Sequence, residues 1–330
     1  MKGIQVAQYV KVSLVLCLSF ISLTRSTSKG PKELKVTELA DPKPGPDDYL
    51  IEVHAAATNF FDILQIQGKY QHQPRNLPLG VGRRVLGHRA RHPGLQQNPP
   101  KFPVGSRVFG ASQGAYASQV CAREAQLLAV PAGWSFADAA GLFVTAPTSY
   151  GALVLRAGVK AGDIVLVHAA AGGVGLAAVQ VAKAFGATVI ATAGSPRKLE
   201  VARAFGADHV VDYRDPTWPD QCIAWNGRIL VVGFAAGSIE KVAMNKVLLK
   251  NISLVGIHWG QYAVHEKESV PVVWEGIGKL IAQGKFRGTT FTDNEYVGLE
   301  RIPDALLALG GRETWGKVVV KVPQGTQSKL

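Results

Sequence analysis

The clearest pattern along the chain is an apolar run, a glycine turn, an amphipathic segment and a second apolar run between residues 163 and 194. The first run, DIVLVHAA at 163–170, lacks alternation, which is typical of a parallel strand buried on both faces. After the glycines AGGVG at 171–175, apolar residues recur at helical spacing, namely Val174, Ala178, Val181, Ala182 and Phe185. The run TVIATAG at 188–194 predicts a second strand. The pattern therefore predicts a strand, helix, strand unit in a parallel sheet.

The glycines lie where the first strand turns into the helix. Residues without a Cβ let the backbone approach a pyrophosphate, and free N–H groups at the helix N-terminus attract its negative charge. We therefore expect a dinucleotide pyrophosphate to be bound by Ala171, Gly172, Gly173, Val174 and Gly175. The alternative is a tight turn that binds no ligand.

The end of the second predicted strand indicates which dinucleotide is bound. An NAD site usually places Asp or Glu there, where it binds the ribose 2′-OH. This chain instead continues with GSPRKLE at 194–200, so Ser195, Arg197 and Lys198 favour a 2′-phosphate and hence NADPH. Glu200 is expected to face away from this site. The alternative is that these residues are only the solvated first turn of the next helix.

Composition and charge set broader limits. A chain of 330 residues with 47% hydrophobic residues is expected to form two domains. The net charge of +12 would favour polyanions, but the stretch VGRRVLGHRARHPG at 81–94 has four arginines and no acid, so the charge is local. The cysteines, Cys17, Cys121 and Cys222, form no CxxC pair, which argues against a disulfide framework or a structural zinc site.

The chain resembles the zinc-free medium-chain reductases, the quinone oxidoreductase or zeta-crystallin group. The resemblance is strongest in the cofactor region, AAAGGVGLAAVQVAKAFGATVIATAGSPRKLEVARAFGADHVVDY. Other similar stretches are HAAATNFFDILQIQGKY at 54–70, GSRVFG at 105–110, AAGLFVTAPTSYGAL at 139–153, RILVVGFAAG at 228–237 and TWGKVVVKVP at 314–323. The resemblance implies an α/β fold, with a doubly wound parallel Rossmann sheet and a β-rich GroES-like substrate domain. The implied ranges are 1–131 for the GroES-like domain, 132–261 for the Rossmann domain and 262–330 for the return to the substrate domain.

The resemblance also implies roles for individual residues. Asn59 and Asp62 match the polar residues of the family's NxxD turn, Tyr70 closes that loop, and Thr145 matches a residue near the nicotinamide. The 2′-phosphate contacts match Ser195, Lys198 and Tyr213, and the backbone at the nicotinamide ribose matches Gly233 and Phe234. Ile66 stands where the family often has Arg, which puts one contact in doubt. Asn59 could instead be a turn residue and Tyr70 a core aromatic.

These matches imply an NADPH-dependent reductase that transfers hydride to a quinone or another conjugated carbonyl. Asn59 stands where a zinc alcohol dehydrogenase would have its first ligand, so no metal is expected. Resemblance alone implies a homodimer, and neither nucleic acid nor membrane is an expected partner. One alternative is a degenerate relative that does not bind the cofactor productively. Another is a nucleic-acid-binding protein that uses the arginines at 83–91.

The segment at residues 12–29 departs from the family pattern. It separates a predicted first strand at 3–10 from its continuation at residue 30, and Val12-Ser13 can be encoded by GTAAGT, an intron-start consensus. We interpret it as an insertion, a retained short intron. The apolar core VSLVLCLSFISL at 12–23 also resembles a signal peptide, but its cleavage would delete the first strand.

Residues 79–97 form a second departure. Codons that permit this sequence also permit, in a shifted frame, a family-like segment with an acid between glycines and then a strand of small residues. We therefore interpret the stretch as frameshifted.

The third departure concerns the Rossmann sheet. Only residues 214–227 separate HVVDY from RILVVGF, which leaves room for barely one crossover. About 30 residues, including the fourth strand of the order 3-2-1-4-5-6, are therefore expected to be missing. Either the strand at 228–234 slides into the vacancy, or the sheet stays open beside the cofactor.

The C-terminal tripeptide Ser328-Lys329-Leu330 matches a peroxisomal address, which implies recognition by the peroxisomal import receptor. We expect a peroxisomal protein, with a cytoplasmic one as the alternative.

Overall fold

The structure is a computed structural model that describes residues 12–18, 30–34, 36, 42–45, 48–67, 83–91, 101–214, 223–233 and 241–324. For residues 12–18 and 83–91 it describes the backbone alone. The predictions on Tyr70, Phe234, the strand at 3–10 and the tripeptide at 328–330 lie outside these residues. No helix among the described residues is long and apolar enough to cross a membrane.

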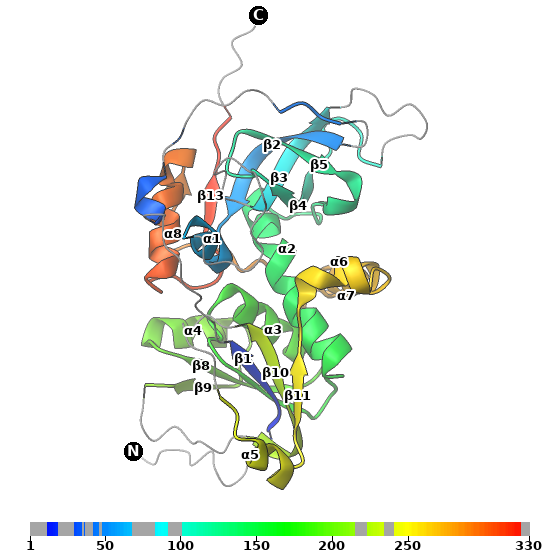
Figure 1. The fold of residues 1–330 in the computed structure, drawn as a ribbon, viewed down its shortest axis with the longest axis vertical. Coiled ribbons are helices and arrows are strands. Elements are labelled where there is room, and N and C mark those ends of the chain that lie inside the picture. Colours follow the sequence, from blue (N-terminus) through cyan, green and yellow to red (C-terminus); the bar gives the residue numbers. More distant parts are fainter. Residues whose placement is uncertain are drawn as a thin grey trace, which may run out of the picture. The chain divides into compact units, whose positions relative to one another are not determined.

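The described chain contains both strands and helices, which alternate between β7 and β9 (Figure 1). The strands are β1 (Val12–Leu18), β2 (Asp48–Ala57), β3 (Arg83–Arg91), β4 (Val108–Gln113), β5 (Gln119–Arg123), β6 (Leu127–Ala129), β7 (Ile164–Val167), β8 (Thr188–Ala193), β9 (His209–Asp212), β10 (Ile223–Gly233), β11 (Ser253–Gly256), β12 (Tyr296–Val297) and β13 (Val319–Lys321). The helices are α1 (Phe60–Ile66), α2 (Phe136–Tyr150), α3 (Gly173–Ala184), α4 (Pro196–Ala204), α5 (Met244–Leu249), α6 (Tyr262–His265), α7 (Ser269–Ala282) and α8 (Ile302–Gly310). A π-helical turn, Gly151–Arg156, follows α2.

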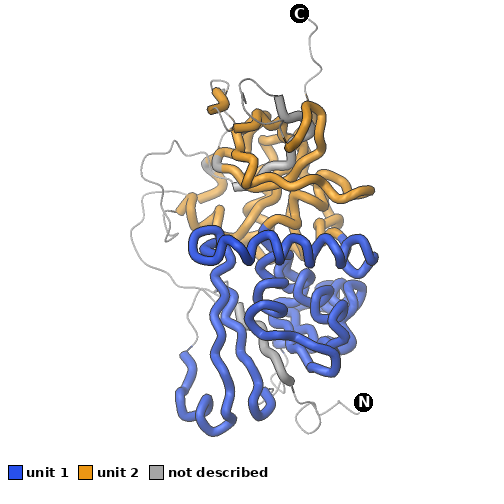
Figure 2. The backbone as a smooth tube through the Cα atoms, turned by 90° about the vertical axis from the view of Figure 1, so that its right-hand side faces the viewer, with its two compact units in different colours: residues 1–22, 144–287 blue, residues 23–143, 288–330 orange. Residues whose placement is uncertain are grey.

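The chain divides into two compact units (Figure 2). Unit 1 comprises Met1–Ser22 and Val144–Arg287, and unit 2 comprises Leu23–Phe143 and Gly288–Leu330. These boundaries differ from those expected at residues 131 and 262. The division falls within α2, and α7 stays with unit 1 because it buries Val273 and Ile277 there.

Unit 1 contains a parallel sheet whose order among the described residues is β11-β10-β1-β7-β8-β9. The predicted strand, helix, strand unit is present as β7, α3 and β8. Its apolar runs are buried as expected: Val165, Val167 and Val189 have no exposed surface.

The N-terminal strand β1 corrects two predictions. It lies in unit 1, parallel to β7 on one side and to β10 on the other, and not in the substrate domain to which residues 12–18 were assigned; that residues 12–29 are an insertion stays a prediction. It also occupies the position predicted to be vacant, so β10 has not moved beside β7 and the sheet is closed between them. The reason is pairing, since a strand between β7 and β10 hydrogen-bonds the edges of both.

Unit 2 is β-rich, with the sheet order β12-β13-β2-β3-β4-β6 and with β5 paired to β2 among the described residues. Strand β3 is made by residues 83–91 and runs antiparallel to β2 and β4. The sequence as given therefore forms a strand at residues 83–91, and the frame-shifted sequence predicts a strand in the same place. The frameshift itself stays a prediction.

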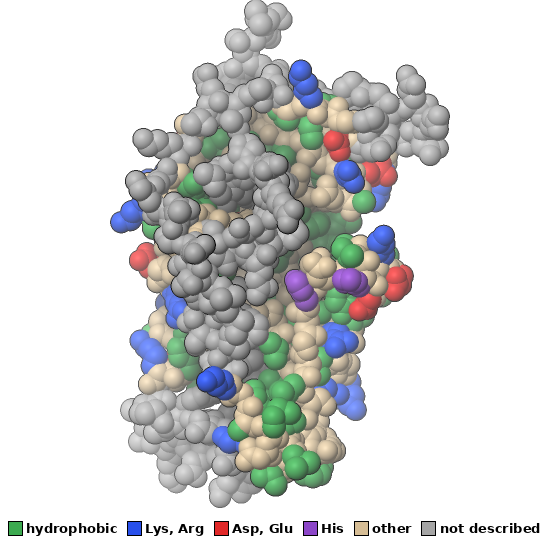
Figure 3. Space-filling model, in the orientation of Figure 1, with side chains coloured by type: hydrophobic (Ala, Val, Ile, Leu, Met, Phe, Trp, Pro, Cys, Tyr) green, Lys and Arg blue, Asp and Glu red, His purple; other side chains and the backbone are tan. Residues whose placement is uncertain are grey.

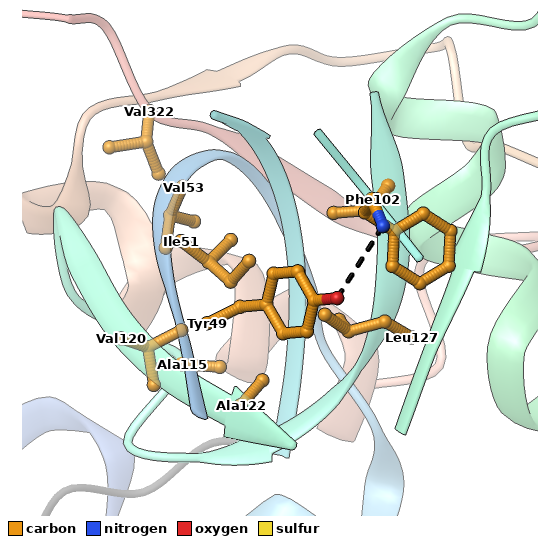
Figure 4. Close-up of a cluster of buried hydrophobic side chains, with 10 residues drawn as sticks. Tyr49, Ile51, Val53, Phe102, Ala115, Val120, Ala122, Leu127 and Val322 are labelled. Carbon is orange, nitrogen blue, oxygen red and sulfur yellow. Dashed lines mark hydrogen bonds between the residues drawn. The ribbon is translucent and has the colours of Figure 1, made fainter. Parts of the chain in front are cut away.

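The core of unit 2 gathers around Tyr49 of β2 (Figure 4). Its ring is fully buried and meets Phe102 edge to face, with ring centroids 5.9 Å apart. Its hydroxyl donates to Glu124 Oε2 at 2.6 Å and accepts from the Phe102 N–H at 3.4 Å. One buried side chain thus joins β2 to the loop at residue 102 and to the turn that follows β5.

Exposed hydrophobic side chains gather over α5 in unit 1 (Figure 3). Met244, Leu248 and Leu249 are each more than two thirds exposed, and Trp225 near the start of β10 is 66% exposed. Asn226 N–H donates to Lys250 O, which ties the end of α5 to the amino-terminal part of β10. This patch therefore lies toward the amino edge of the parallel sheet, away from its carboxyl edge.

Tyr49→Phe is expected to lower the free energy of unfolding by about 1–3 kcal/mol, because it leaves the buried Phe102 N–H without its acceptor. Urea denaturation followed by fluorescence measures the change. Tyr213→Phe, at a half-exposed tyrosine, is the control and should leave stability unchanged. Equal midpoints for the two variants would contradict the role given to the Tyr49 hydroxyl.

Candidate functional site

The candidate binding residues of unit 1 lie at one edge of its sheet. All pairs of neighbouring strands in this sheet are parallel, so their carboxyl ends share that edge. The glycine turn follows β7, Ser195 follows β8, Tyr213 follows β9, and Gly233 ends β10. Ligands of open α/β sheets bind at this edge, where the strand order reverses.

The glycine turn between β7 and α3 has a constrained backbone. Ala169 adopts a positive φ of 48°, which is uncommon for a residue with a Cβ. The turn is closed by a hydrogen bond from the Gly172 N–H to Ala169 O at 2.9 Å and is tied to β8 by one from the Ala170 N–H to Thr192 O at 2.9 Å. Gly172 caps α3 with an extended backbone and no side-chain cap, so the first N–H groups of α3 have no capping side chain.

Gly175 allows α3 to pack against the turn. A Cβ at this position would lie 2.5 Å from Ala169 O and 2.7 Å from the Ala170 backbone, which no real contact permits. The structure thus gives this glycine a packing role, and its predicted contact with a pyrophosphate stays a prediction. The N-terminus of α3 is held at the sheet edge as a result.

One residue of α2, Ser149, supports the same helix. Ser149 is fully buried, and its hydroxyl donates to Val174 O at 2.7 Å. Thr145, predicted to lie near the nicotinamide, is 4% exposed and precedes Ser149 by one helical turn, so both are on one face of α2. Sequence reasoning missed Ser149, although the quoted stretch at 139–153 contains it.

The ends of β8 and β9 bring together the residues predicted to bind a 2′-phosphate. Ser195 caps α4 by accepting from the Lys198 N–H at 3.4 Å, as the alternative reading also predicts. A Cβ on Gly194 would lie 2.6 Å from the Tyr213 hydroxyl, so the phenol reaches across to the residue beside Ser195. Ser195, Lys198 and Tyr213 therefore form a group at the end of β8.

The carboxylates near this group are held by arginines. Glu200 is in an ion pair with Arg197 at 3.8 Å, on the exposed surface of α4. Asp212 accepts three hydrogen bonds from the Arg214 side chain, which lower the pKa of the carboxyl to about 2. No carboxylate stands directly after β8, where an NAD site would place one.

His168 follows β7 and is buried beside β8. Its Nδ1 lies 3.1 Å from Thr192 Oγ1, and burial lowers the pKa of the imidazole below its usual value. Burial thus favours the neutral form of the ring over the charged one.

In unit 2 the predicted catalytic residues Asn59 and Asp62 form a capping box at the start of α1. The Asn59 N–H donates to Asp62 Oδ2 at 2.7 Å, and the Asp62 N–H donates back to Asn59 O at 3.0 Å. The Tyr116 hydroxyl donates to the same Oδ2 at 2.8 Å. Asn59 Nδ2 donates to Ala57 O at 3.2 Å. The structure therefore gives both residues a role in the turn, as the alternative reading for Asn59 predicts, and their catalytic role stays a prediction.

Lys317 completes this network and was missed from the sequence. The residue is 5% exposed, and its ammonium donates to Thr58 O and to Asn59 Oδ1. Gly141 makes room for its stem, since a Cβ there would lie 3.2 Å from Lys317 Cβ and Cγ. The signal that could have found it is a lysine directly before the apolar run at 318–320, because a lysine beside a buried strand needs polar partners.

Comparisons with known proteins agree with this geometry. A family model described as zinc-binding dehydrogenase matches residues 173–225. Quinone oxidoreductase-like protein 2 of Mus musculus is 33% identical over 322 residues, which cover 88% of this chain and 89% of the mouse protein. The chain belongs to the quinone oxidoreductase family. Quinone oxidoreductase of Homo sapiens is 29% identical over 283 residues, covering 74% of this chain and 84% of the human protein.

A solved structure confirms the predicted α/β fold of this oxidoreductase family. The crystal structure of Escherichia coli quinone oxidoreductase complexed with NADPH is 26% identical and has a TM-score of 0.77. The match covers 90% of this chain and 98% of the bacterial one. The Rossmann and GroES-like architecture expected from the sequence is thus present.

Gly175→Ala is expected to lower the free energy of unfolding by about 1–3 kcal/mol, because the added methyl must push α3 away from the turn. Thermal unfolding measures the effect. Gly278→Ala in α7 is the matched control, since nothing lies within 4 Å of a Cβ there, and it should be neutral or stabilising. A loss of stability in Gly278→Ala as large as in Gly175→Ala would contradict the packing role of Gly175.

Proposed function

We propose that this protein is an NADPH-dependent reductase that transfers hydride to a quinone or another conjugated carbonyl without a metal. The observation that carries the proposal is the carboxyl edge of the sheet in unit 1. There a glycine turn follows β7 at the start of α3, and the neighbouring parallel strand β8 is followed by cationic residues with no carboxylate directly after the strand. A dinucleotide with a 2′-phosphate requires both features.

The turn fits a pyrophosphate. Gly172 and Gly173 add no side chain between a ligand and the first N–H groups of α3, and Gly175 keeps that helix against the sheet. Backbone donors at a helix N-terminus favour an anion through both hydrogen bonding and the helix dipole. We assign the pyrophosphate to residues 171–175.

The end of β8 fits a 2′-phosphate better than a free 2′-OH. Lys198 supplies a cation, while the hydroxyls of Ser195 and Tyr213 supply further donors. Glu200, the nearest carboxylate on α4, is held by Arg197 and cannot serve as the ribose acceptor without breaking that pair. NADPH is therefore favoured over NADH.

When bound, NADPH supplies a hydride at its nicotinamide C4 to an acceptor that has a low-lying empty orbital. Gly233 ends β10 at the same edge as the glycine turn, and a Cβ there would meet nothing within 4 Å, so this backbone is open to a ribose. Ser149 holds α3 through its hydrogen bond to Val174 O, and Thr145 is buried one turn earlier on the same face of α2. These residues fix the position of the dinucleotide rather than exchange protons with it.

The donor chemistry of the described residues supports a reaction without metal. No group of three or more His, Cys, Asp or Glu among them converges as a metal site would require. Asn59 stands where a zinc enzyme would have its first ligand, and its amide is engaged by Lys317 and Asp62. The quinone or conjugated carbonyl acceptor is suggested by the relatives, which are named as quinone oxidoreductases.

Lys198→Ala is expected to weaken NADPH binding by about 10- to 100-fold, because one charge-assisted contact to the 2′-phosphate is lost. NADH binding should be unchanged. Isothermal titration calorimetry of both cofactors measures the difference. Arg203→Ala, in the last turn of the same helix, is the matched control and should leave both affinities unchanged. An equal loss for NADPH and NADH would contradict the 2′-phosphate assignment, and a wild-type chain that binds neither would contradict the function.

NADPH oxidation with a soluble quinone is expected to persist after dialysis against a chelator, since Asn59 stands where a zinc enzyme would have its first ligand. Absorbance at the nicotinamide band measures the rate. Loss of activity on chelation, restored by added zinc, would contradict the metal-free reaction.

A further inference from the structure

The N-terminal strand β1 stands between the two halves of the parallel sheet (Figure 1). Leu14, Val15 and Leu16 pair with residues 165–167 of β7. On its other edge, residues 14–17 of β1 pair with residues 228–231 of β10, and Leu18 pairs with Gly233. The strand is therefore paired with β10 over nearly its whole length and with β7 over its central residues.

This position is the one at which a doubly wound sheet reverses its order. From β7 the chain continues outward through β8 to β9, whereas β10 and β11 lie on the opposite side of β1. In a Rossmann sheet the fourth strand lies at this point, beside the first, and it follows the third strand in sequence. Here the segment between β9 and β10, residues 213–222, is too short to supply a helix, a strand and another helix.

The sequence of β1 suits an interior strand. VSLVLCL is almost wholly apolar, as expected of a parallel strand covered on both faces, and Ser13 is its only polar residue. The neighbouring strands are core elements, since Val165, Val167 and Leu230 are fully buried. Without β1, the facing edges of β7 and β10 would leave buried N–H and C=O groups without partners.

We propose that Val12–Leu18 replaces the fourth Rossmann strand and completes the nucleotide-binding edge of the sheet, so that NADPH binding requires the N-terminal segment. Because β1 is parallel to β7, its carboxyl end at Leu18 lies at the same edge as the glycine turn and Gly233. The expected effect on NADPH binding rests on the proposed function. The position of β1 in the sheet does not depend on it.

The same inference implies that the apolar segment beginning at residue 12 can act either as an export signal or as a strand of the sheet, but not as both. As an export signal it would be removed, and the sheet would lose its central strand. As β1, residues 12–18 are held between β7 and β10 and cannot be bound by an export receptor at the same time. Export and nucleotide binding by one chain are therefore mutually exclusive.

The strand placement can be tested by a disulfide between paired positions. Cys17 pairs with Val231, and neighbouring strands are about 4.8 Å apart, within the Cα separation that a disulfide spans. In the full chain with Cys121→Ser and Cys222→Ser, Val231→Cys is expected to form an intramolecular disulfide. Trypsin then yields a crosslinked pair of peptides, one ending at Arg25 and one beginning at Ile229, which mass spectrometry detects.

Gly256→Cys in the same background is the matched control. Gly256 pairs with Val231 on the far side of β10, so it lies about two strand spacings, or about 10 Å, from Cys17, too far for a disulfide. A Cβ there has open space and costs nothing sterically. Crosslinking of both variants, of neither, or only between two chains would overturn the placement of β1 within its own sheet.

A measurement on the unmodified chain tests the placement of β1 even if one of the cysteine variants does not fold. In hydrogen exchange, amides of residues 14–17 are expected to be protected as strongly as those of β7 and β10. Exchange at the rate of an unstructured chain would overturn the proposal.

The binding consequence is tested with Val15→Pro. A proline in a central strand removes one ladder hydrogen bond, so NADPH affinity in calorimetry should fall by at least about tenfold. Val104→Pro is the control, because Val104 is 61% exposed. It is the second residue of a turn that is closed by a hydrogen bond from the Ser106 N–H to Pro103 O, and proline fits that position.

The outcomes separate this inference from the proposed function. A Val15→Pro chain that binds NADPH as tightly as the wild type overturns the inference and leaves the function intact. A wild-type chain that forms the predicted crosslink yet binds no NADPH overturns the function and leaves the strand in place. A Val15→Pro chain that fails to fold supports the inference, since a dispensable insertion would tolerate proline.

Discussion

Hydrogen bonding along the edges of β7 and β10 is the constraint on which unit 1 depends. In a parallel sheet covered on both faces, each interior strand must pair on both sides, because no water reaches its backbone. β7 pairs with β8 on one edge, and β10 pairs with β11, which leaves the two facing edges to be satisfied. Pairing with Val12–Leu18 satisfies both, and it keeps the carboxyl ends of β7 and β10 at one edge. The glycine turn and Gly233 are brought into one site by that pairing.

The part of the fold that could be predicted from the sequence is the part made by local signals. An apolar run, a glycine turn and a helical repeat lie consecutively in the chain, and the structure places β7, α3 and β8 on them. Ser195 and Lys198 were read from the residues directly after β8, whereas Tyr213 was added from the family resemblance, and the structure brings it close because β8 and β9 are parallel and end at a common edge. The position of β1 could not be predicted in this way, since its partners lie about 150 and about 215 residues further along the chain. An apolar run of that length fits a strand, a signal core or an inserted segment equally well.

Unit 2 illustrates a second limit of sequence reasoning. Asn59 and Asp62 were recognised as polar residues in a turn, but the sequence does not show that Lys317, far along the chain, donates to the Asn59 amide. A buried ammonium among neutral oxygens requires each of its donors to be matched, and Thr58 O and Asn59 Oδ1 provide two of the acceptors. The N-terminal turn of α1 and the segment before β13 are therefore fixed to each other. Loss of Lys317 would release both segments. The network therefore supports the turn at the start of α1, whether or not its residues also take part in chemistry.

The relocation of a central strand to the N-terminus also changes the order in which unit 1 can form. A fourth strand that follows β9 in sequence would pair as soon as β7 is present, whereas β1 is synthesised first and must wait for residues 164–167 and 223–233. Pairing over such separations is slow because the loop must close before any contact is gained. During that interval the apolar run at 12–18 is unpaired, which is the state in which an export receptor or another chain could bind it. Formation of the sheet around β1 therefore removes residues 12–18 from such binding, and it also completes the nucleotide-binding edge.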